Sequence, residues 1–249
     1  MALSGPNYGV KPTERQSNAD STEASSQTTQ HKQTQTHQSP TRRGASSLRR
    51  RTASQGPYKA SKYERHSDHI PHTSSPSEEA YILSLKTDKA HHDALTALRD
   101  RYLPRHLNKL SAHIAIFRAL PGSKLEETGH DISALSQEQH VFSIKTSSPF
   151  RLKHGVGIQI SPGADEAQAV FEDLRSTWVA FLSKQDNGRF RAHYTIMNKV
   201  DDEEEIGNCL DEVKRSFEAN KGVIEGLKLW RYEKGYWKFE RTWDFSDRK

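Results

Sequence analysis

The sequence predicts an α+β fold over residues 77–249, in which two lobes of antiparallel strands carry helices on the outside. Two observations support this prediction. The order strand, helix, histidine-bearing strand occurs twice, and the 76 residues before it have almost no apolar periodicity. A repeated order of elements is typical of an internal duplication. We therefore expect two lobes related by a pseudo-two-fold axis, with a cleft between them, after a disordered N-terminal tail.

Residues 1–76 are predicted to form this disordered tail. They are rich in Ser, Thr, Gln, Asn and His, so they cannot bury enough apolar surface to offset the entropy lost on ordering. Up to Ser75 there are 11 Lys and Arg against 5 Asp and Glu, which leaves 26 against 27 for the rest of the chain. The arginines at 42–43 and 49–51 fit a nuclear address, a phosphate-binding patch, a kinase site ending at Thr52, or a solvated tail with no dedicated role.

The elements of the first half follow from apolar patterns and capping residues. Residues 81–85 form a short apolar run typical of a strand, and Asp88 then begins a helix that ends before Pro104. The apolar face of this helix is formed by Ala94, Leu95, Leu98 and Tyr102. A strand headed by His113 comes next, followed by a polar loop through 121–122. The remaining elements expected in this half are strands near 141–144 and 155–160 and a hairpin through Pro149.

The second half repeats this order. After the strand at 155–160, apolar residues recur at helical spacing, and a strand headed by His193 follows. A third helix has acidic residues 201–205 at its N-terminal end, where negative charge is favourable. The apolar positions of these two helices are Ala167, Val170, Phe171, Leu174, Trp178, Phe181 and Leu182, then Ile206, Cys209, Leu210, Val213 and Phe217. The chain is predicted to end in a hairpin of 223–230 and 236–245.

Two short stretches carry the candidate site, His113-Ile114-Ala115-Ile116 and His193-Tyr194-Thr195-Ile196. Side chains alternate between the two faces of a strand, so His113 and Ala115 share one face. The same parity places Arg191, His193 and Thr195 together, while the residues between them turn toward a core. If the two strands face each other across the cleft, the two imidazoles meet there.

Paired imidazoles suit acid–base catalysis, because the unperturbed pKa of histidine is about 6.5. One neutral ring would take a proton from the attacking group, and the other, as imidazolium, would protonate the leaving group. The environment must separate the two pKa values, and the sequence does not say which ring is the base. The alternative is that both are structural histidines; the matching repeat favours the catalytic interpretation.

The paired motif resembles that of the two-histidine (2H) phosphoesterase superfamily, whose mark is a repeated His-x-Thr/Ser-x strand motif. The second copy fits this mark fully, whereas the first has Ala115 at the hydroxyl position. The segments 120–123, 198–200 and 229–232 resemble the fungal branch of the 2′-5′ RNA ligase-like group, and the likeness extends over about 78–247. It implies the bilobal fold and substrates that are RNA ends or small nucleotides.

The resemblance also suggests roles for residues around the histidines. The Thr195 hydroxyl would donate to a non-bridging phosphate oxygen, and Ala115 offers no such donor, an absence that costs about 10²–10³ in rate at comparable sites. Arg191 is a candidate phosphate clamp, with a solvated strand-edge arginine as the alternative. Arg118 has the opposite strand parity from His113, so the prediction leaves it out of the site.

The leading functional prediction is a metal-independent phosphodiesterase that opens 2′,3′-cyclic phosphates of RNA ends or small nucleotides, or performs the reverse 2′-5′ ligation. Hydrolysis and ligation use the same two histidine roles. The rival prediction is a catalytically weakened or inactive module that binds nucleotides or RNA ends, with Ala115 marking the lost activity. The near-neutral charge of the domain argues against a long nucleic-acid track, which requires many Lys and Arg on one face.

Other patterns limit cofactors, partners and location. No Cys cluster or His-Glu-x-x-His motif indicates a metal, and no cofactor is expected. Tyr236 and Trp237 fit either stacking on a nucleobase or packing in the core. The single cysteine, Cys209, is expected to pack in the core and agrees with a reducing compartment. No apolar stretch approaches the about 18 residues that span a bilayer, and no signal-peptide pattern is present. We expect a monomeric protein of the cytoplasm, the nucleus or both, without a membrane partner.

Overall fold

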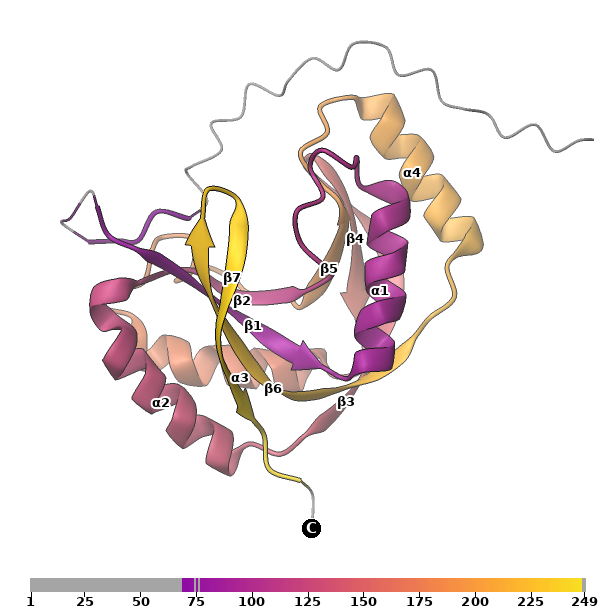
Figure 1. Cartoon of the computed structure of the whole chain (residues 1–249). Helices are drawn as coiled ribbons and strands as arrows, with labels where there is room; N and C mark the ends of the chain where they lie inside the picture. The colour runs from indigo at the N-terminus through magenta and orange to yellow at the C-terminus, as the bar shows by residue number, and fades with distance from the viewer. Residues whose placement is uncertain (1–68, 74, 76, 248–249) are drawn as a thin grey trace, which may run out of the picture. The chain divides into compact units, whose positions relative to one another are not determined.

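Within the part of the chain that the structure describes, seven strands form one antiparallel sheet (Figure 1). The computed structural model describes residues 69–73, 75 and 77–247. The strands are β1 (Ala80–Thr87), β2 (Ile114–Pro121), β3 (Phe142–Leu152), β4 (Gly155–Ile160), β5 (His193–Met197), β6 (Lys221–Glu233) and β7 (Tyr236–Asp244). They are ordered β2-β1-β6-β3-β4-β5, and β7 pairs with β6. The predicted α+β class is confirmed. Strand β6 joins the pair β2-β1 to the group β3-β4-β5 by pairing with both β1 and β3.

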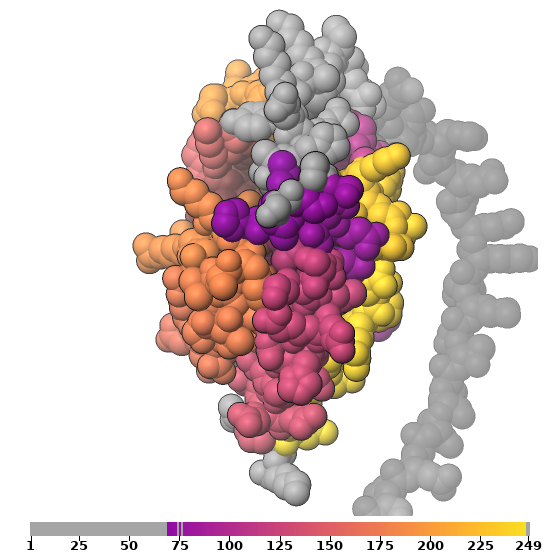
Figure 2. All heavy atoms as spheres, turned by 90° about the vertical axis from the view of Figure 1, so that its left-hand side faces the viewer, coloured from indigo at the N-terminus to yellow at the C-terminus, as the bar shows by residue number. Residues whose placement is uncertain are grey.

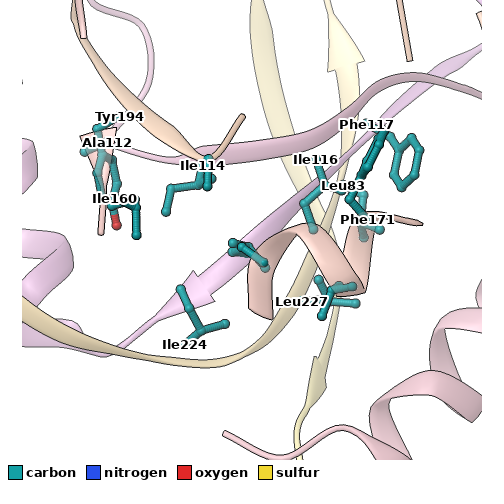
Figure 3. Packing of buried hydrophobic residues seen from close by; sticks show 14 of the residues in the cluster. Leu83, Ala112, Ile114, Ile116, Phe117, Ile160, Phe171, Tyr194, Ile224 and Leu227 are labelled. Atoms are coloured by element: carbon teal, nitrogen blue, oxygen red, sulfur yellow. The ribbon is translucent and has the colours of Figure 1, made fainter. Parts of the chain in front are cut away.

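Two helices within the described residues pack on a histidine strand of the other half. The described helices are α1 (Lys89–Tyr102), the 3₁₀ helix η2 (Gly122–Lys124), α2 (Leu125–Glu138), α3 (Ala164–Trp178) and α4 (Glu203–Ser216). Helix α1 belongs to the first half but packs against β5. Helix α3 belongs to the second half but packs on β2, where the Phe117 ring lies 5.2 Å from Phe171 and 5.1 Å from Trp178 (Figure 3). Each half therefore supplies a helix that supports the histidine strand of the other.

Aspartate caps fix where two of these helices begin. The Asp88 carboxylate accepts the N–H of His91 at 2.9 Å, and also the N–H of Val223 from β6 at 2.7 Å. Asp202 caps α4 by accepting the N–H groups of Glu204 and Glu205. Side-chain oxygens at this position satisfy donors that have no partner inside the helix. The predicted helix start at Asp88 and the acidic start of α4 are confirmed.

Two local predictions in the first half are wrong. The expected polar loop after 121–122 is the helix pair η2 and α2, whose buried positions are Thr128, Ile132 and Ser136. Because two of these three residues are polar, the apolar pattern does not reveal the helix. The expected hairpin through Pro149 turns instead at 153–154. Pro149 lies inside β3 next to a register shift, the kind of irregular position where a strand tolerates proline.

The cysteine packs as the sequence predicts. Cys209 is buried on the inner face of α4 between Ile206 and Val213. Burial raises the pKa of its thiol to about 11, so the thiolate that a nucleophile requires is not populated near neutral pH. Within the described residues, no helix is long and apolar enough to cross a membrane.

The predicted tail lies mostly beyond the described part of the chain. The arginine clusters at 42–43 and 49–51 and Thr52 lie outside the described residues. Residues 69–73 and 75 fall within the stretch predicted as tail and are described. Figure 2 shows the segment from residue 69 into β1 on the surface beside the C-terminal strands. This segment brings His69 to the candidate site.

Candidate active site

The two motif histidines are held by the same local hydrogen bond. His113 directly precedes β2, and its Nδ1 lies 2.8 Å from the carbonyl oxygen of Ser111. His193 begins β5, and its Nδ1 lies 2.7 Å from the carbonyl oxygen of Arg191. A carbonyl only accepts, so Nδ1 carries the hydrogen in each ring and Nε2 is the basic nitrogen of the neutral form. Both rings are thereby oriented for proton transfer at Nε2.

Both histidines line one cavity of about 530 Å³, together with Ala115 and Thr195. This volume lies within the range of about 300–1,000 Å³ common for small-molecule sites. Among the described residues that line it there is no carboxylate. The basic side chains are Arg99, Lys109, Arg118, Lys199, Lys234, His69, His106, His113 and His193. A pocket whose lysines and arginines face no carboxylate among its described lining residues has the electrostatic character that an anionic ligand requires.

A β-bulge in β2 turns Arg118 into this cavity, contrary to the parity prediction. Ala115 is paired with Ser84 of β1, whereas Phe117 is paired with Leu83, the adjacent position. One extra residue therefore lies between Ala115 and Phe117, which shifts the strand alternation by one at Phe117 and Arg118, and a second register shift follows between Phe117 and Leu120. Phe117 remains buried and Arg118 becomes a residue of the cavity wall. The sequence prediction that left Arg118 outside the site is corrected.

The same bulge recurs in β5, which extends the internal repeat beyond the histidine motifs. Thr195 is paired with Gly157 of β4, and Met197 is paired with the adjacent Val156. Met197 is buried, and the following residue, Asn198, lines the cavity as Arg118 does in the first half. The two strands therefore supply matched positions in the order histidine, hydroxyl position, bulge and polar residue.

Asp186, from the second half of the chain, anchors β2 at the register shift between Phe117 and Leu120, directly after the first bulge. Its buried carboxylate accepts the N–H groups of Arg118 at 2.9 Å and Ala119 at 2.8 Å. Its own N–H donates to the Ser183 hydroxyl at 3.1 Å. Burial raises the pKa of Asp186, and the two backbone N–H bonds oppose that rise. The carboxylate thus satisfies two N–H groups at an irregular point of the strand ladder.

Replacing Asp186 with alanine should lower the free energy of unfolding by about 2–4 kcal/mol, because two N–H groups beside the bulge lose their acceptor. Urea unfolding of the purified variants measures this change. Asp173→Ala, an exposed aspartate of α3, serves as the matched control and should stay within about 0.5 kcal/mol of wild type. A midpoint for Asp186→Ala equal to that of the control would show that the carboxylate does not stabilise β2.

Arg99 is a buried cation that the sequence analysis missed. It lies on α1 with a relative exposure of 7%, and its Nη1 donates to the carbonyl oxygen of Thr195. Its Nε donates to Asn108 and to the carbonyl oxygen of Leu110. Burial lowers the pKa of Arg99 to about 10, so the guanidinium keeps its charge at neutral pH. A signal was present, because Arg99 stands four residues after Leu95 on the face predicted to be apolar.

Burial and nearby arginines lower the pKa of both histidines by different amounts. The pKa of His113 falls to about 3, chiefly through burial and next through the charge of Arg99. Burial also lowers the pKa of His193, and the charges of Arg118 and Arg191 contribute to this shift. A positive charge on His193 also lowers the pKa of His113. Both imidazoles are therefore neutral in the free protein at neutral pH.

Arg191 is not among the described residues that line the cavity. It is exposed, and its guanidinium lies 4.5 Å from the centroid of the Phe150 ring. Its contact with the site is the carbonyl oxygen that orients His193. Its role as a phosphate clamp stays a prediction, and Arg118 and Arg99 are the arginines that line the cavity.

Aromatic rings form one wall of the cavity. The Trp237 ring lies 4.3 Å from the ring of His113, while its neighbour Tyr236 is 54% exposed. His69 stacks on Tyr232 with a centroid distance of 4.3 Å, and its Nδ1 lies 2.8 Å from the carbonyl oxygen of Arg118. Trp237 thus contributes to the pocket rather than to the core. Spacing gave no sign of His69, which comes from the segment before β1.

Comparison with known proteins identifies the family. The profile of the 2′-5′ RNA ligase superfamily matches residues 87–236, which contain both histidine strands and most of the cavity. The chain belongs to the 2′-5′ RNA ligase superfamily. The resemblance to 2H phosphoesterases is thereby confirmed. A search of curated proteins finds no match.

Solved structures resemble this member of the 2′-5′ RNA ligase superfamily over 68% of its length. One described as a phosphoesterase is 9% identical, is covered over 99% of its chain and has a TM-score of 0.51, which shows a shared fold. Escherichia coli LigT complexed with 3′-AMP is 9% identical, is covered over 99% and has a TM-score of 0.49. The protein TT0787 of Thermus thermophilus is 12% identical, is covered over 100% and has a TM-score of 0.48.

Proposed function

We propose that the protein is a phosphodiesterase that opens 2′,3′-cyclic phosphates at RNA ends or on small nucleotides. The observation that carries this proposal is the pair of imidazoles whose Nδ1 atoms are fixed by backbone carbonyls in a cavity lined by cations, with no carboxylate among its described residues. Membership of the 2′-5′ RNA ligase superfamily supports phosphodiesterase or ligase-like chemistry. An anionic phosphodiester matches the charge of this cavity, and two imidazoles match the two proton transfers of its hydrolysis.

In this proposal His113 is the general base and His193 the general acid. His113 has the strongly lowered pKa, so it is unprotonated and takes a proton from water at Nε2 as the water oxygen attacks phosphorus. His193 donates the proton on its Nε2 to the ribose oxygen as the phosphorus–oxygen bond breaks. A bound phosphate anion raises the pKa of His193 and favours this protonated form. The product is a phosphate monoester beside a free ribose hydroxyl.

The non-bridging oxygens gain charge in the transition state and require donors. Thr195 supplies a hydroxyl from β5, and the guanidinium groups of Arg118 and Arg99 supply positive charge from the cavity wall. Ala115 occupies the position that matches Thr195 and supplies no donor. The proposed site is therefore asymmetric: the hydroxyl comes from the second half and the arginines from the first.

The same two proton transfers run in reverse in 2′-5′ ligation, so ligation is the alternative direction of this proposal. The large molar excess of water favours hydrolysis. A second candidate function is a nucleotide-binding or RNA-end-binding module with little activity. The observation that favours it is Ala115, which lines the cavity where a hydroxyl residue would face the phosphate.

The test is hydrolysis of the four 2′,3′-cyclic nucleoside monophosphates by the full chain in the presence of EDTA. We expect turnover to a monophosphate, with the position of the phosphate identified by chromatography against the 2′ and 3′ standards. Turnover that EDTA abolishes would contradict the metal-independent mechanism. A folded wild-type protein that binds these nucleotides without turnover would favour the binding module.

A further inference from the structure

A second cavity of about 180 Å³ adjoins the candidate active site, and the proposed function gives it no role. The two cavities share the side chains of Lys109, Leu110, His113 and Trp237. On its own the smaller cavity lies below the range of about 300–1,000 Å³ common for small-molecule sites. It therefore lies against the catalytic cavity and is too small to hold a small molecule by itself.

The groups that line this second cavity fit a phosphate and a base. Lys228 of β6 and Lys109 supply positive charge, and no carboxylate is among the described residues that line it. The indole of Trp230 is held by its Nε1, which donates to Ser84 at 2.8 Å, and it lies 6.3 Å from the ring of Trp237. Fixed aromatic rings and nearby lysines are the combination that binds single-stranded nucleic acid.

Tyr194 provides an independent sign that the cavity takes a polar ligand. Its side chain is 1% exposed, and its hydroxyl has no partner in hydrogen-bonding geometry among the described residues. The Thr87 hydroxyl lies near enough to lower the pKa of Tyr194, against the larger rise caused by burial, but it does not meet that hydrogen-bonding geometry. A buried hydroxyl without a partner costs free energy, which a ligand donor or acceptor in the cavity would recover.

We propose that the second cavity binds the nucleotide that precedes the cyclic end, so that the preferred substrate is an RNA 3′ end of at least two nucleotides rather than a mononucleotide. This inference rests on the proposed function. The phosphodiester between the two nucleotides lies between Lys109 and Lys228, and the preceding nucleoside packs beside Trp230. A 2′,3′-cyclic mononucleotide with a free 5′-hydroxyl leaves these groups unused.

The test compares three substrates: a 2′,3′-cyclic mononucleotide, the same compound with a 5′-phosphate, and a dinucleotide with a 2′,3′-cyclic end. We expect kcat/KM for the dinucleotide to exceed that for the mononucleotide by about tenfold or more, the size of one charged hydrogen bond. Lys228→Ala should lower the dinucleotide value by about tenfold and the mononucleotide value much less. Lys221→Ala, an exposed lysine of the same strand outside both cavities, should change neither.

Three results would overturn the proposal of a second subsite. One is equal kcat/KM for mononucleotide and dinucleotide, and another is an equal loss on both substrates in Lys228→Ala. The third is a 5′-phosphorylated mononucleotide that matches the dinucleotide, which would reduce the subsite to a phosphate contact. If no substrate is turned over, the proposed function fails separately. Calorimetric binding of a 3′-phosphorylated dinucleotide and mononucleotide to the same proteins then decides the subsite, which requires tighter dinucleotide binding that depends on Lys228.

Discussion

Replacing His113 or His193 with alanine should each lower kcat for 2′,3′-cyclic phosphate opening by about 10²–10⁴, since each substitution removes one proton-transfer group. The double variant should be little slower than the slower single variant, because the two groups act on the same transition state. Initial rates with a cyclic mononucleotide in EDTA measure both effects. Cavity charge and Thr195 remain in all three variants, so nucleotide binding should persist and separate lost catalysis from lost folding.

His130→Ala is the matched control for these variants. His130 lies on α2 with a side chain that is 86% exposed, outside both histidine strands, and its removal should leave the rate unchanged. A wild-type rate in His113→Ala or in His193→Ala would contradict the paired mechanism. Loss of rate in the control as well would point to a defect of folding rather than of chemistry.

The pH profile distinguishes the proposed base from the proposed acid. Because kcat/KM reports the free protein, a base with a pKa of about 3 stays active down to that pH. An acid must be protonated, so its contribution falls as pH rises through its pKa, and burial lowers that pKa below the ordinary 6.5 of His193. The optimum of kcat/KM is therefore expected between about pH 3 and 6.5. The optimum of kcat should be more alkaline, because the bound phosphate raises the pKa of His193. The alkaline fall should disappear in His193→Ala.

The histidine strands could be predicted because their signal is local. Alternation alone puts His193 and Thr195 on one face and Tyr194 on the other, and the structure places the first two at the cavity and buries Tyr194. Repetition of this pattern at His113 then predicts that the two halves match. The fold class follows from the same repeat. The hydrophobic period identifies an element as strand or helix even where the predicted ends of that element are wrong.

The arginines could not be placed from the sequence because their positions depend on contacts between distant segments. Arg118 reaches the cavity through a bulge, and Asp186 anchors the strand directly after it from 67 or more residues away along the chain. Arg99 reaches it because α1 packs against the strand of the other half, where it donates to the carbonyl oxygen of Thr195. Strand parity assumes a regular ladder, and helix periodicity does not say which strand a helix will cover.

The charge of the site likewise does not follow from the charge of the domain. The chain after Ser75 has 26 basic and 27 acidic residues, a balance that argues against a long nucleic-acid track and does not reveal a local cationic site. The fold nevertheless gathers five Lys and Arg side chains around one cavity and leaves the carboxylates elsewhere among the described residues. A short anionic end fits this local concentration, and a long duplex would require a cationic face that a neutral domain does not supply.

Ala115→Thr should raise the rate of cyclic phosphate opening by up to about 10², because it restores a hydroxyl at the position that matches Thr195. The structure meets the condition on which this depends: Ala115 is half-buried, lies in β2 and lines the cavity rather than the core. Threonine also suits a strand, so the substitution should not oppose the fold. Measurement of kcat on a cyclic mononucleotide, with unfolding midpoints beside it, tests the prediction.

Ala115→Val is the decisive control, since valine adds similar bulk without the hydroxyl. A gain in threonine alone would show that a donor was missing from an otherwise competent site, in keeping with an enzyme slowed at one position. Equal rates in the threonine and valine variants would mean that Arg118 and Arg99 already stabilise the phosphate and that the hydroxyl adds nothing. If the threonine variant binds nucleotides but shows no turnover, the binding module is favoured. The restored residue would then complete a motif whose histidines do not transfer protons.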